Sequence, residues 1–220
     1  MRRLLIIVIS ALMFFSACGL FQTREEKSAQ ELVADGMAAY EKKKYRSSIE
    51  SFQKLKDWYP FSKYAILAEL KIADAYFFLD EYEEAIAAYE SFEALHPRNE
   101  AAPYVIYQLG MSYVNQMETI DRDQLSARKA IETFNRLKRL FPNDSYSLKA
   151  DGFILKATQN LVAHDFYIAE YYYRQGRYPA ALLRFRSIIS DYPDVGIHQK
   201  ALVYIPLCEA KIAEQEAKKK

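Results

Sequence analysis

The pattern of apolar positions along the chain repeats four times, and each copy ends at a proline. Aliphatic or aromatic residues stand eleven, eight and five positions before each of these prolines, and a small residue stands twelve before. Spacings of three place the apolar side chains on one face of a helix, and a helix does not continue easily into a proline. The pattern therefore predicts four amphipathic helices, which end at Pro60, Pro97, Pro142 and Pro193.

A partner helix is expected upstream of each of these helices. A small residue stands 24 positions before three of the prolines, at Gly36, Ala73 and Ala169, and a turn followed by a tyrosine separates it from the second helix. Small side chains let two helices cross closely, with the aromatic ring of the second helix beside them. The order of small residue, turn, Tyr, Ala, aromatic and Pro resembles the tetratricopeptide repeat. That resemblance implies an all-α, superhelical solenoid of about five helix hairpins.

The third and fourth repeats depart from this spacing. Gly110 lies 32 positions before Pro142 rather than 24, which predicts an eight-residue insertion near 117–125. Such a loop is either a binding element or a tolerated insertion, and both interpretations stay open. An additional helix is expected from about Ser145 through Val162, running on into the fourth repeat. A final helix from Gln199 to about Glu216 either begins a fifth repeat or caps the solenoid.

The N-terminus carries the pattern of a bacterial signal peptide. Two arginines precede an apolar run of twelve residues, 4–15, which Ser16-Ala17-Cys18 follows. Twelve helical residues span about 18 Å, well short of the roughly 30 Å hydrocarbon core, so cleavage is expected. Cys18 after two small residues resembles the lipobox, although Phe15 stands where Leu is usual. The resemblance implies S-diacylglycerol and N-acyl groups on Cys18, and Gly19 in place of Asp favours the outer membrane.

These features divide the chain into segments. The predicted order is signal peptide 1–17, acylated Cys and tether 18–28, repeat one 29–61, repeat two 62–98, repeat three 99–143, extra helix with repeat four 144–194, and C-terminal helix with basic tail 195–220.

Charge and composition argue against several functions. The formal net charge is +1, and removal of the two signal-peptide arginines leaves +1 − 2 = −1, so no nucleic-acid partner is expected. Cys208 is expected to be a small buried hydrophobe. The three histidines, His96, His164 and His198, lack metal-ligand spacing, and the six glycines form no phosphate loop. We therefore expect that the protein is not an enzyme and that it binds no metal and no cofactor other than the acyl groups.

Several features together resemble the BamD (ComL) family. They are the lipobox, the repeats after a short tether, the lengthened third repeat, and the phrase His164-Asp165-Phe166-Tyr167-Ile168-Ala169 before the turn Gly176-Arg177-Tyr178. That family is the lipoprotein component of the outer-membrane β-barrel assembly machinery. The resemblance implies a lipid-anchored scaffold on the periplasmic face of the outer membrane. Its implied partners are the large barrel-forming subunit through its periplasmic domains, other assembly lipoproteins and unfolded outer-membrane proteins.

The resemblance also suggests where partners bind. It implies that the N-terminal repeats receive the extended C-terminal signal of an unfolded outer-membrane protein, on a surface rich in aromatic rings. The candidate residues for this site are Tyr40, Lys63, Tyr64, Tyr76 and Phe77, with Lys63 meeting the peptide carboxylate. The C-terminal half is expected to dock the barrel-forming subunit, with candidates Arg184, Arg186 and Lys200. For each aromatic residue, core packing is the alternative role.

Two other functions remain open on the sequence alone. An adaptor for cell-wall or envelope-constriction machinery would co-purify with cell-wall synthases. A substrate-holding chaperone acting alone would suppress aggregation of unfolded membrane proteins without a stable complex.

Overall fold

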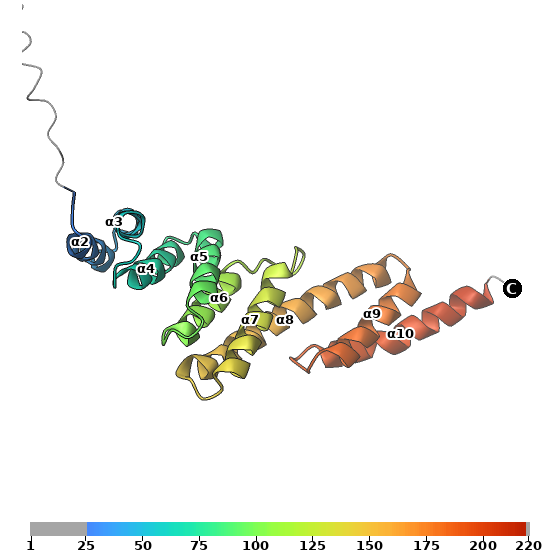
Figure 1. Cartoon of the computed structure of the whole chain (residues 1–220). Helices are drawn as coiled ribbons and strands as arrows, with labels where there is room; N and C mark the ends of the chain where they lie inside the picture. The colour runs from blue at the N-terminus through green and yellow to red at the C-terminus, as the bar shows by residue number, and fades with distance from the viewer. Residues whose placement is uncertain (1–25, 219–220) are drawn as a thin grey trace, which may run out of the picture.

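The computed structural model describes residues 26–218, and all regular structure in this part of the chain is α-helical. Consecutive helices pack as antiparallel hairpins that stack in a row and form an elongated solenoid (Figure 1). The all-α solenoid expected from the repeat pattern is therefore confirmed. The helices are α2 Ala29–Glu41, α3 Tyr45–Trp58, α4 Ala65–Phe78, α5 Tyr82–Leu95, α6 Ala102–Asn115, α7 Leu125–Leu140, α8 Ser145–Arg174, α9 Tyr178–Asp191 and α10 His198–Ala217.

Helix ends follow local sequence signals. Ser28 caps α2 in a capping box, since its hydroxyl accepts the Glu31 N–H and the Glu31 carboxylate accepts the Ser28 N–H. The second helix of each hairpin, α3, α5, α7 and α9, ends two residues before its proline. Three hairpin turns place a residue with positive φ seventeen positions before the proline: Lys43 (56°), Asp80 (59°) and Gly176 (71°).

Small residues allow the two helices of a hairpin to cross closely, as the sequence predicted. A Cβ atom added to Gly36 would lie 2.8 Å from the Phe52 ring, and one added to Gly110 would lie 2.5 Å from the Phe134 ring. Ala73 and Ala169 take the equivalent positions in the other hairpins and are fully buried. The core accordingly consists of four hydrophobic clusters, each shared by neighbouring hairpins.

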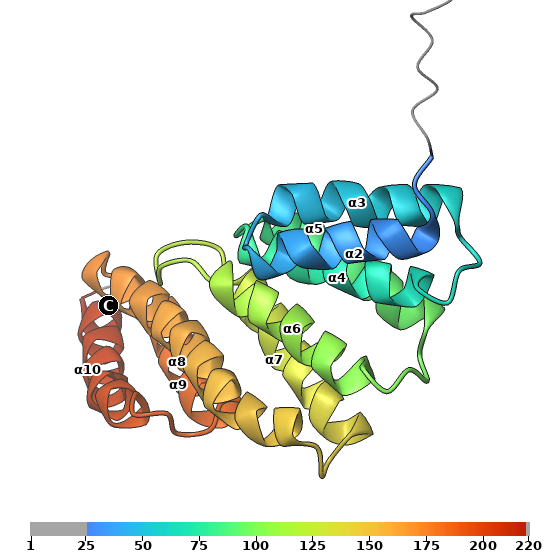
Figure 2. The same cartoon turned by 90° about the vertical axis from the view of Figure 1, so that its left-hand side faces the viewer.

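The helix α8 joins the two halves of the solenoid. It is one continuous helix of 30 residues, about 45 Å long, so the expected extra helix and the first helix of the fourth repeat are a single element. Its first part packs against α6 and α7 and its second part against α9, and Figure 2 shows it lying between these two groups of helices.

The insertion in the third repeat is a loop of residues 116–124 between α6 and α7. Side chains hold it against α8: the Asn160 amide donates to the Glu118 carbonyl (3.1 Å), and His164 Nδ1 lies 2.6 Å from the Ile120 carbonyl oxygen. The Gln124 side chain, itself buried, donates to two carbonyls within the loop. The loop therefore has a fixed shape.

Candidate functional site

The N-terminal repeats enclose a buried carboxylate that sequence reasoning missed. Asp74 of α4 is 1% exposed. Its Oδ1 accepts hydrogen bonds from the hydroxyls of Tyr89 on α5 (2.9 Å) and Tyr104 on α6 (2.8 Å), and its Oδ2 pairs with Lys71 Nζ at 2.9 Å. The only signal in the sequence was an acid directly after the small crossing residue Ala73. This network joins two hairpins through one side chain.

The candidate residue Tyr40 lies beside this network. Lys71 Nζ is 4.5 Å from the centroid of the Tyr40 ring. Burial and the neighbouring Asp74 carboxylate raise the pKa of Tyr40, Tyr89 and Tyr104 well above the usual range. All three phenols therefore keep their protons well into alkaline pH, and Tyr89 and Tyr104 donate to Asp74.

Tyr40 also belongs to a partly exposed aromatic cluster at the turn end of the first two hairpins. Its ring meets Tyr45 at 5.5 Å and Phe78 at 6.1 Å, and Tyr45 stacks on Phe78 at 5.3 Å. The rings of Phe77 and Tyr82 continue the cluster from Phe78. Phe78 is 47% exposed and was not among the predicted site residues. The aromatic cluster, as used below, is Tyr40, Tyr45, Phe77, Phe78 and Tyr82.

The five residues predicted for peptide binding do not form one group. Tyr40 and Phe77 share the aromatic cluster, whereas Tyr76 packs between two of the hydrophobic core clusters. Lys63 and Tyr64 lie just before the start of α4, with the Lys63 ammonium 5.0 Å from the centroid of the Tyr64 ring. Twelve helical residues separate Tyr64 from Tyr76, which corresponds to about 18 Å. The structure therefore places the candidates at the two ends of α4.

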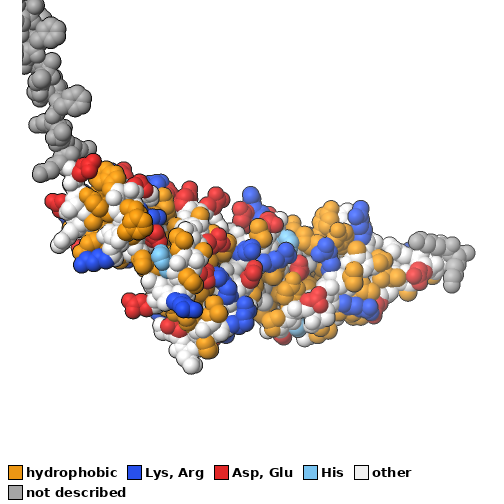
Figure 3. Space-filling view, in the orientation of Figure 1, with side chains coloured by type: hydrophobic (Ala, Val, Ile, Leu, Met, Phe, Trp, Pro, Cys, Tyr) orange, Lys and Arg blue, Asp and Glu red, His pale blue; other side chains and the backbone are white. Residues whose placement is uncertain are grey.

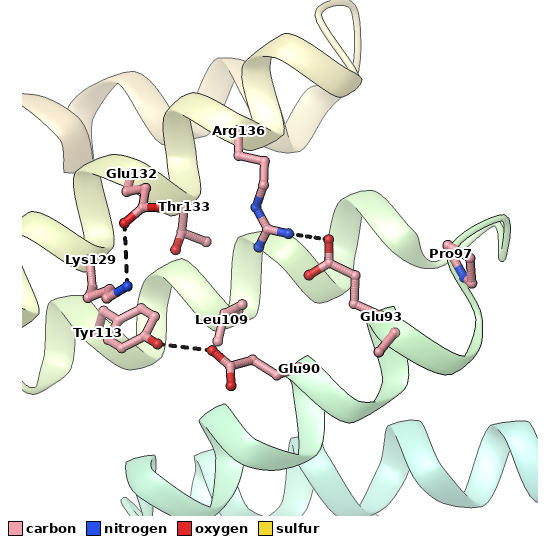
Figure 4. Close-up of a pocket in the computed structure, with 10 residues that line it drawn as sticks. Glu90, Glu93, Pro97, Leu109, Tyr113, Lys129, Glu132, Thr133 and Arg136 are labelled. Carbon is pink, nitrogen blue, oxygen red and sulfur yellow. Dashed lines mark hydrogen bonds and ion pairs between the residues drawn. The ribbon is translucent and has the colours of Figure 1, made fainter.

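A polar cavity of about 600 Å³ lies between α5, α6 and α7 (Figure 4). Arg136 Nη1 pairs with Glu93 at 2.5 Å, and the Tyr113 hydroxyl donates to Glu90 at 3.2 Å. Burial and the Glu90 carboxylate raise the pKa of Tyr113 to about 12. Lys129 and Glu132 complete the wall from α7. These residues were not predicted, although their spacings of three and four on α5 and α7 mark one face of each helix.

The three candidate docking residues of the C-terminal half point to different surroundings. Arg184 of α9 stacks over the Tyr172 ring, 5.4 Å from its centroid, and lines a hollow of about 400 Å³ between α8 and α9. Arg186 pairs instead with Glu209 of α10 at 2.6 Å. Lys200 is exposed on α10. Two residues apart on a helix, Arg184 and Arg186 face roughly opposite sides.

An acid takes the position of Asp74 in the last full hairpin. Asp74 and Glu170 each stand 23 residues before the proline of their repeat. Glu170 accepts a hydrogen bond from the Tyr204 hydroxyl of α10 at 2.9 Å and pairs with Arg174 at 2.5 Å. Each acid thus binds a tyrosine of the helix that follows its hairpin, α6 for Asp74 and α10 for Glu170. The two halves therefore hold that next helix in the same way.

The remaining polar candidates are structural. His96 Nε2 lies 2.7 Å from a Glu69 carboxylate oxygen, and His164 holds the 116–124 loop. Cys208 is buried, which raises the pKa of its thiol, so the expectation of a small buried hydrophobe is confirmed. Within residues 26–218, no group of three or more His, Cys, Asp or Glu side chains could hold a metal ion. Cys18 lies outside the described residues.

The exposed surface mixes charge types. Figure 3 shows basic and acidic side chains interspersed with hydrophobic ones over the visible face. In the part of the chain that the structure describes, no helix has both the length and the apolar character needed to cross a membrane.

The hairpins and their close crossings define a tetratricopeptide-type repeat protein. More narrowly, the chain belongs to the YfiO family of outer membrane lipoproteins, whose family model matches residues 25–220.

Two BamD proteins agree with this assignment. The chain is similar to the outer membrane protein assembly factor BamD of Neisseria meningitidis serogroup A, with 27% identity over 205 residues, covering 89% of this chain and 77% of the relative. It is similar to BamD of Vibrio cholerae, with 25% identity, covering 78% and 76%. The resemblance to the BamD family is therefore confirmed. A tetratricopeptide repeat protein from Parabacteroides merdae is 15% identical over 87% of this chain and 77% of that one, with a TM-score of 0.46.

Proposed function

We propose that this chain is a lipid-anchored scaffold of the outer-membrane β-barrel assembly machinery. It binds the barrel-forming subunit and the C-terminal signals of unfolded outer-membrane proteins, and so assists their folding and insertion. The observation that carries the proposal is the family match over residues 25–220, together with similarity to BamD relatives over most of both chains. A binding role rather than a catalytic one suits the open surfaces between its hairpins.

The proposed anchor is Cys18, carrying diacylglycerol and an N-acyl chain. Several acyl chains on one residue, at about 0.8 kcal/mol per buried methylene, hold a protein on a membrane almost permanently, whereas a single chain binds reversibly. Lys27, which directly precedes the N-cap of α2, follows Cys18 by nine residues. Nine extended residues reach about 32 Å at most, so the first hairpin stays close to the membrane surface.

The proposed signal site runs along α4 from the aromatic cluster to Lys63. An extended peptide rises about 3.3 Å per residue, so the roughly 18 Å between the two ends of α4 corresponds to five or six peptide residues. The exposed ring of Phe78, with Tyr40 at its edge, offers flat surface to an aromatic side chain that lies five or six residues before the peptide terminus. Lys63 offers a positive charge to the terminal carboxylate at the other end.

The proposed docking surface for the barrel-forming subunit lies on α9 and α10. The exposed guanidinium of Arg184, which lies over the Tyr172 ring, suits a carboxylate of a partner. Arg186 is engaged by Glu209, so it contributes less unless that ion pair opens.

A pull-down from outer membranes through a C-terminal tag, in mild detergent, tests the scaffold proposal. Stoichiometric recovery of one large integral β-barrel protein with periplasmic domains, and loss of membrane location in a Cys18→Ala chain, is the expected result. Recovery of cell-wall synthases would identify an adaptor for that machinery instead. Suppressed aggregation of unfolded membrane proteins with no stable complex would identify a chaperone that acts alone.

Photo-crosslinking tests the signal site separately. A crosslinking amino acid at position 78 or 63 should capture a peptide that ends in an aromatic residue with a free carboxylate. Position 148 serves as the control, because Leu148 is 69% exposed but lies on α8. Amidation of the peptide should weaken capture at 63 more than at 78. Equal capture at all three positions would rule out a defined site.

A further inference from the structure

Two large aromatic side chains are exposed at the end of the molecule where the described chain begins. Trp58, the last residue of α3, is 49% exposed, and Phe61 in the following loop is 100% exposed. Trp58 lines a hollow together with Glu26 and Lys27, the first residues that the structure describes. Figure 3 shows hydrophobic side chains on the surface beside the point where the grey trace begins.

The loop that carries Phe61 has a fixed shape. The Ser62 N–H donates to the Tyr59 carbonyl at 3.0 Å, which forms a β-turn with Pro60 and Phe61 at its central positions. The Tyr59 hydroxyl donates to the Lys27 carbonyl at 3.1 Å, so the turn is fastened to the residues just before α2. The Tyr59 ring packs against the core of the first hairpin. Phe61 is therefore held outward by the fold.

The surroundings of these rings have the composition of a membrane-interface contact. Lys54 is exposed and lines the same hollow as Trp58, together with the acids Glu26 and Asp35, and Ile66 and Leu67 in the first turn of α4 are partly exposed. Tryptophan and other aromatic rings favour the headgroup level of a bilayer, and lysines near them attract anionic phospholipids. We call Lys54, Trp58 and Phe61 the interfacial patch.

We propose that the interfacial patch contacts the phospholipid surface beside the lipid anchor and so orients the solenoid on the membrane. The proposal rests on the proposed acylation of Cys18, which attaches the chain at most about 32 Å from Lys27. Because Tyr59 fastens the turn to Lys27, the patch lies at the attachment end of the molecule. An anchor alone restrains position but not orientation, whereas a second contact at the same end restrains both.

The chain contains its own probe for this contact, since Trp58 is its single tryptophan. The full lipid-modified chain is placed in vesicles of phosphatidylethanolamine and phosphatidylglycerol, with either ordinary or brominated acyl chains. Bromine quenches tryptophan that lies at or below the headgroups. We expect Trp58 emission to fall in the brominated vesicles and to shift to shorter wavelengths in ordinary ones. Equal emission in both kinds of vesicle would overturn the proposal.

Matched variants separate contact from mere proximity. Phe61→Ser should reduce the quenching of Trp58, because it removes the apolar side chain at the tip of the turn. In a Trp58→Phe/Leu148→Trp chain, the tryptophan has moved to α8 on the same anchor, and its emission should not respond to bromine. Quenching of equal size at position 148 would contradict an oriented contact. A Trp58 emission shift caused only by the barrel-forming subunit, without lipid quenching, would identify a protein surface instead.

Sedimentation with the vesicles distinguishes this inference from the proposed anchoring. If the chain does not sediment, acylation of Cys18 has failed as a proposal. A chain carrying a histidine tag at position 18 is then held on nickel-chelating lipids, and Trp58 quenching is measured in the same way. Sedimentation without quenching refutes the patch alone.

Discussion

The second and fourth hairpins carry an acid and an aromatic residue at the same repeat positions but pack them with different contacts. In both, an acid stands 23 residues before the proline and an aromatic residue stands eight before it. In the second hairpin the aromatic residue is Tyr89, whose hydroxyl reaches Asp74 in the core. In the fourth it is Phe185, which has no hydroxyl, and its ring instead stacks on Tyr204 at 4.8 Å and meets Phe166 at 5.5 Å.

The consequence is a difference in burial of the two acids. Asp74 is 1% exposed and accepts two phenol hydrogen bonds in addition to its ion pair with Lys71. The Glu170 side chain remains 28% exposed and accepts one phenol hydrogen bond beside Arg174. A buried carboxylate needs several donors to offset its lost hydration. The hairpin with a tyrosine hydroxyl eight residues before its proline, at Tyr89, therefore has the buried acid. The hairpin with Phe185 at that position has the partly exposed acid.

The largest effect is expected in the apolar hairpin. Phe185→Ala should lower the free energy of unfolding by about 3–5 kcal/mol, because it removes the fully buried ring at the centre of an aromatic stack. Urea unfolding followed by far-ultraviolet circular dichroism measures the loss. Leu183→Ala on the same helix, where the side chain is exposed, should change stability by less than about 0.5 kcal/mol. Equal effects would mean that the stack does not hold this hairpin.

The next effect compares the two acids. Asp74→Ala should cost about 1–3 kcal/mol for the buried phenols that lose their acceptor. Glu170→Ala should cost less, since Tyr204 and Arg174 can turn to water. Hydrogen exchange should show the loss for Asp74→Ala in α4, α5 and α6 rather than across the whole chain. A larger cost for Glu170→Ala would reverse the proposed difference.

A third comparison sets a glycine in a hairpin turn, Gly176, against a glycine inside a helix, Gly152. Gly176 has φ of 71° with nothing within 4 Å of an added Cβ, so Gly176→Ala tests backbone strain alone and should cost about 1–2 kcal/mol. Asp80 holds the equivalent conformation and accepts a hydrogen bond from Tyr82. Gly152→Ala, inside α8 with open space around it, should stabilise by about 0.5–1 kcal/mol. Thermal unfolding of Gly176→Ala and Gly152→Ala shows whether the first lowers the melting temperature and the second raises it.

The smallest destabilisation among the substitutions in the two hairpins' packing is expected from exchanging the hydroxyl itself. Tyr89→Phe removes one of two phenol donors from Asp74 and should cost about 0.5–1.5 kcal/mol. Its counterpart, Phe185→Tyr, places a hydroxyl in an apolar stack and should also destabilise unless Glu170 moves inward to accept it. A crystal structure of Phe185→Tyr with Glu170 buried against the new hydroxyl would show that the repeat position alone controls burial of the acid.

The hairpins could be predicted because their signals are local. Four prolines with apolar residues at fixed offsets mark the second helices, and Gly36 and Gly110 mark close crossings whose aromatic neighbours, Phe52 and Phe134, stand at the expected positions. The candidate sites were harder to predict, since a list of exposed aromatic residues does not say which rings meet. Tyr40 and Phe77 came together with Phe78, whereas Tyr76 entered the core and Lys63 lies at the far end of α4.

The sequence by itself determined the helices, their ends and the way in which each hairpin closes, because these depend on residues within one repeat. Only the tertiary structure decided which polar groups are buried together, since Asp74, Tyr89 and Tyr104 lie on three helices and across two hairpins. It also decided that Trp58 and Phe61 lie beside the residues that precede α2, a proximity that depends on the Tyr59 hydroxyl reaching the Lys27 carbonyl 32 residues away. The acids Asp74 and Glu170 recur at one repeat position, but their partners Tyr104 and Tyr204 stand at different distances from the prolines, so spacing alone does not predict these contacts.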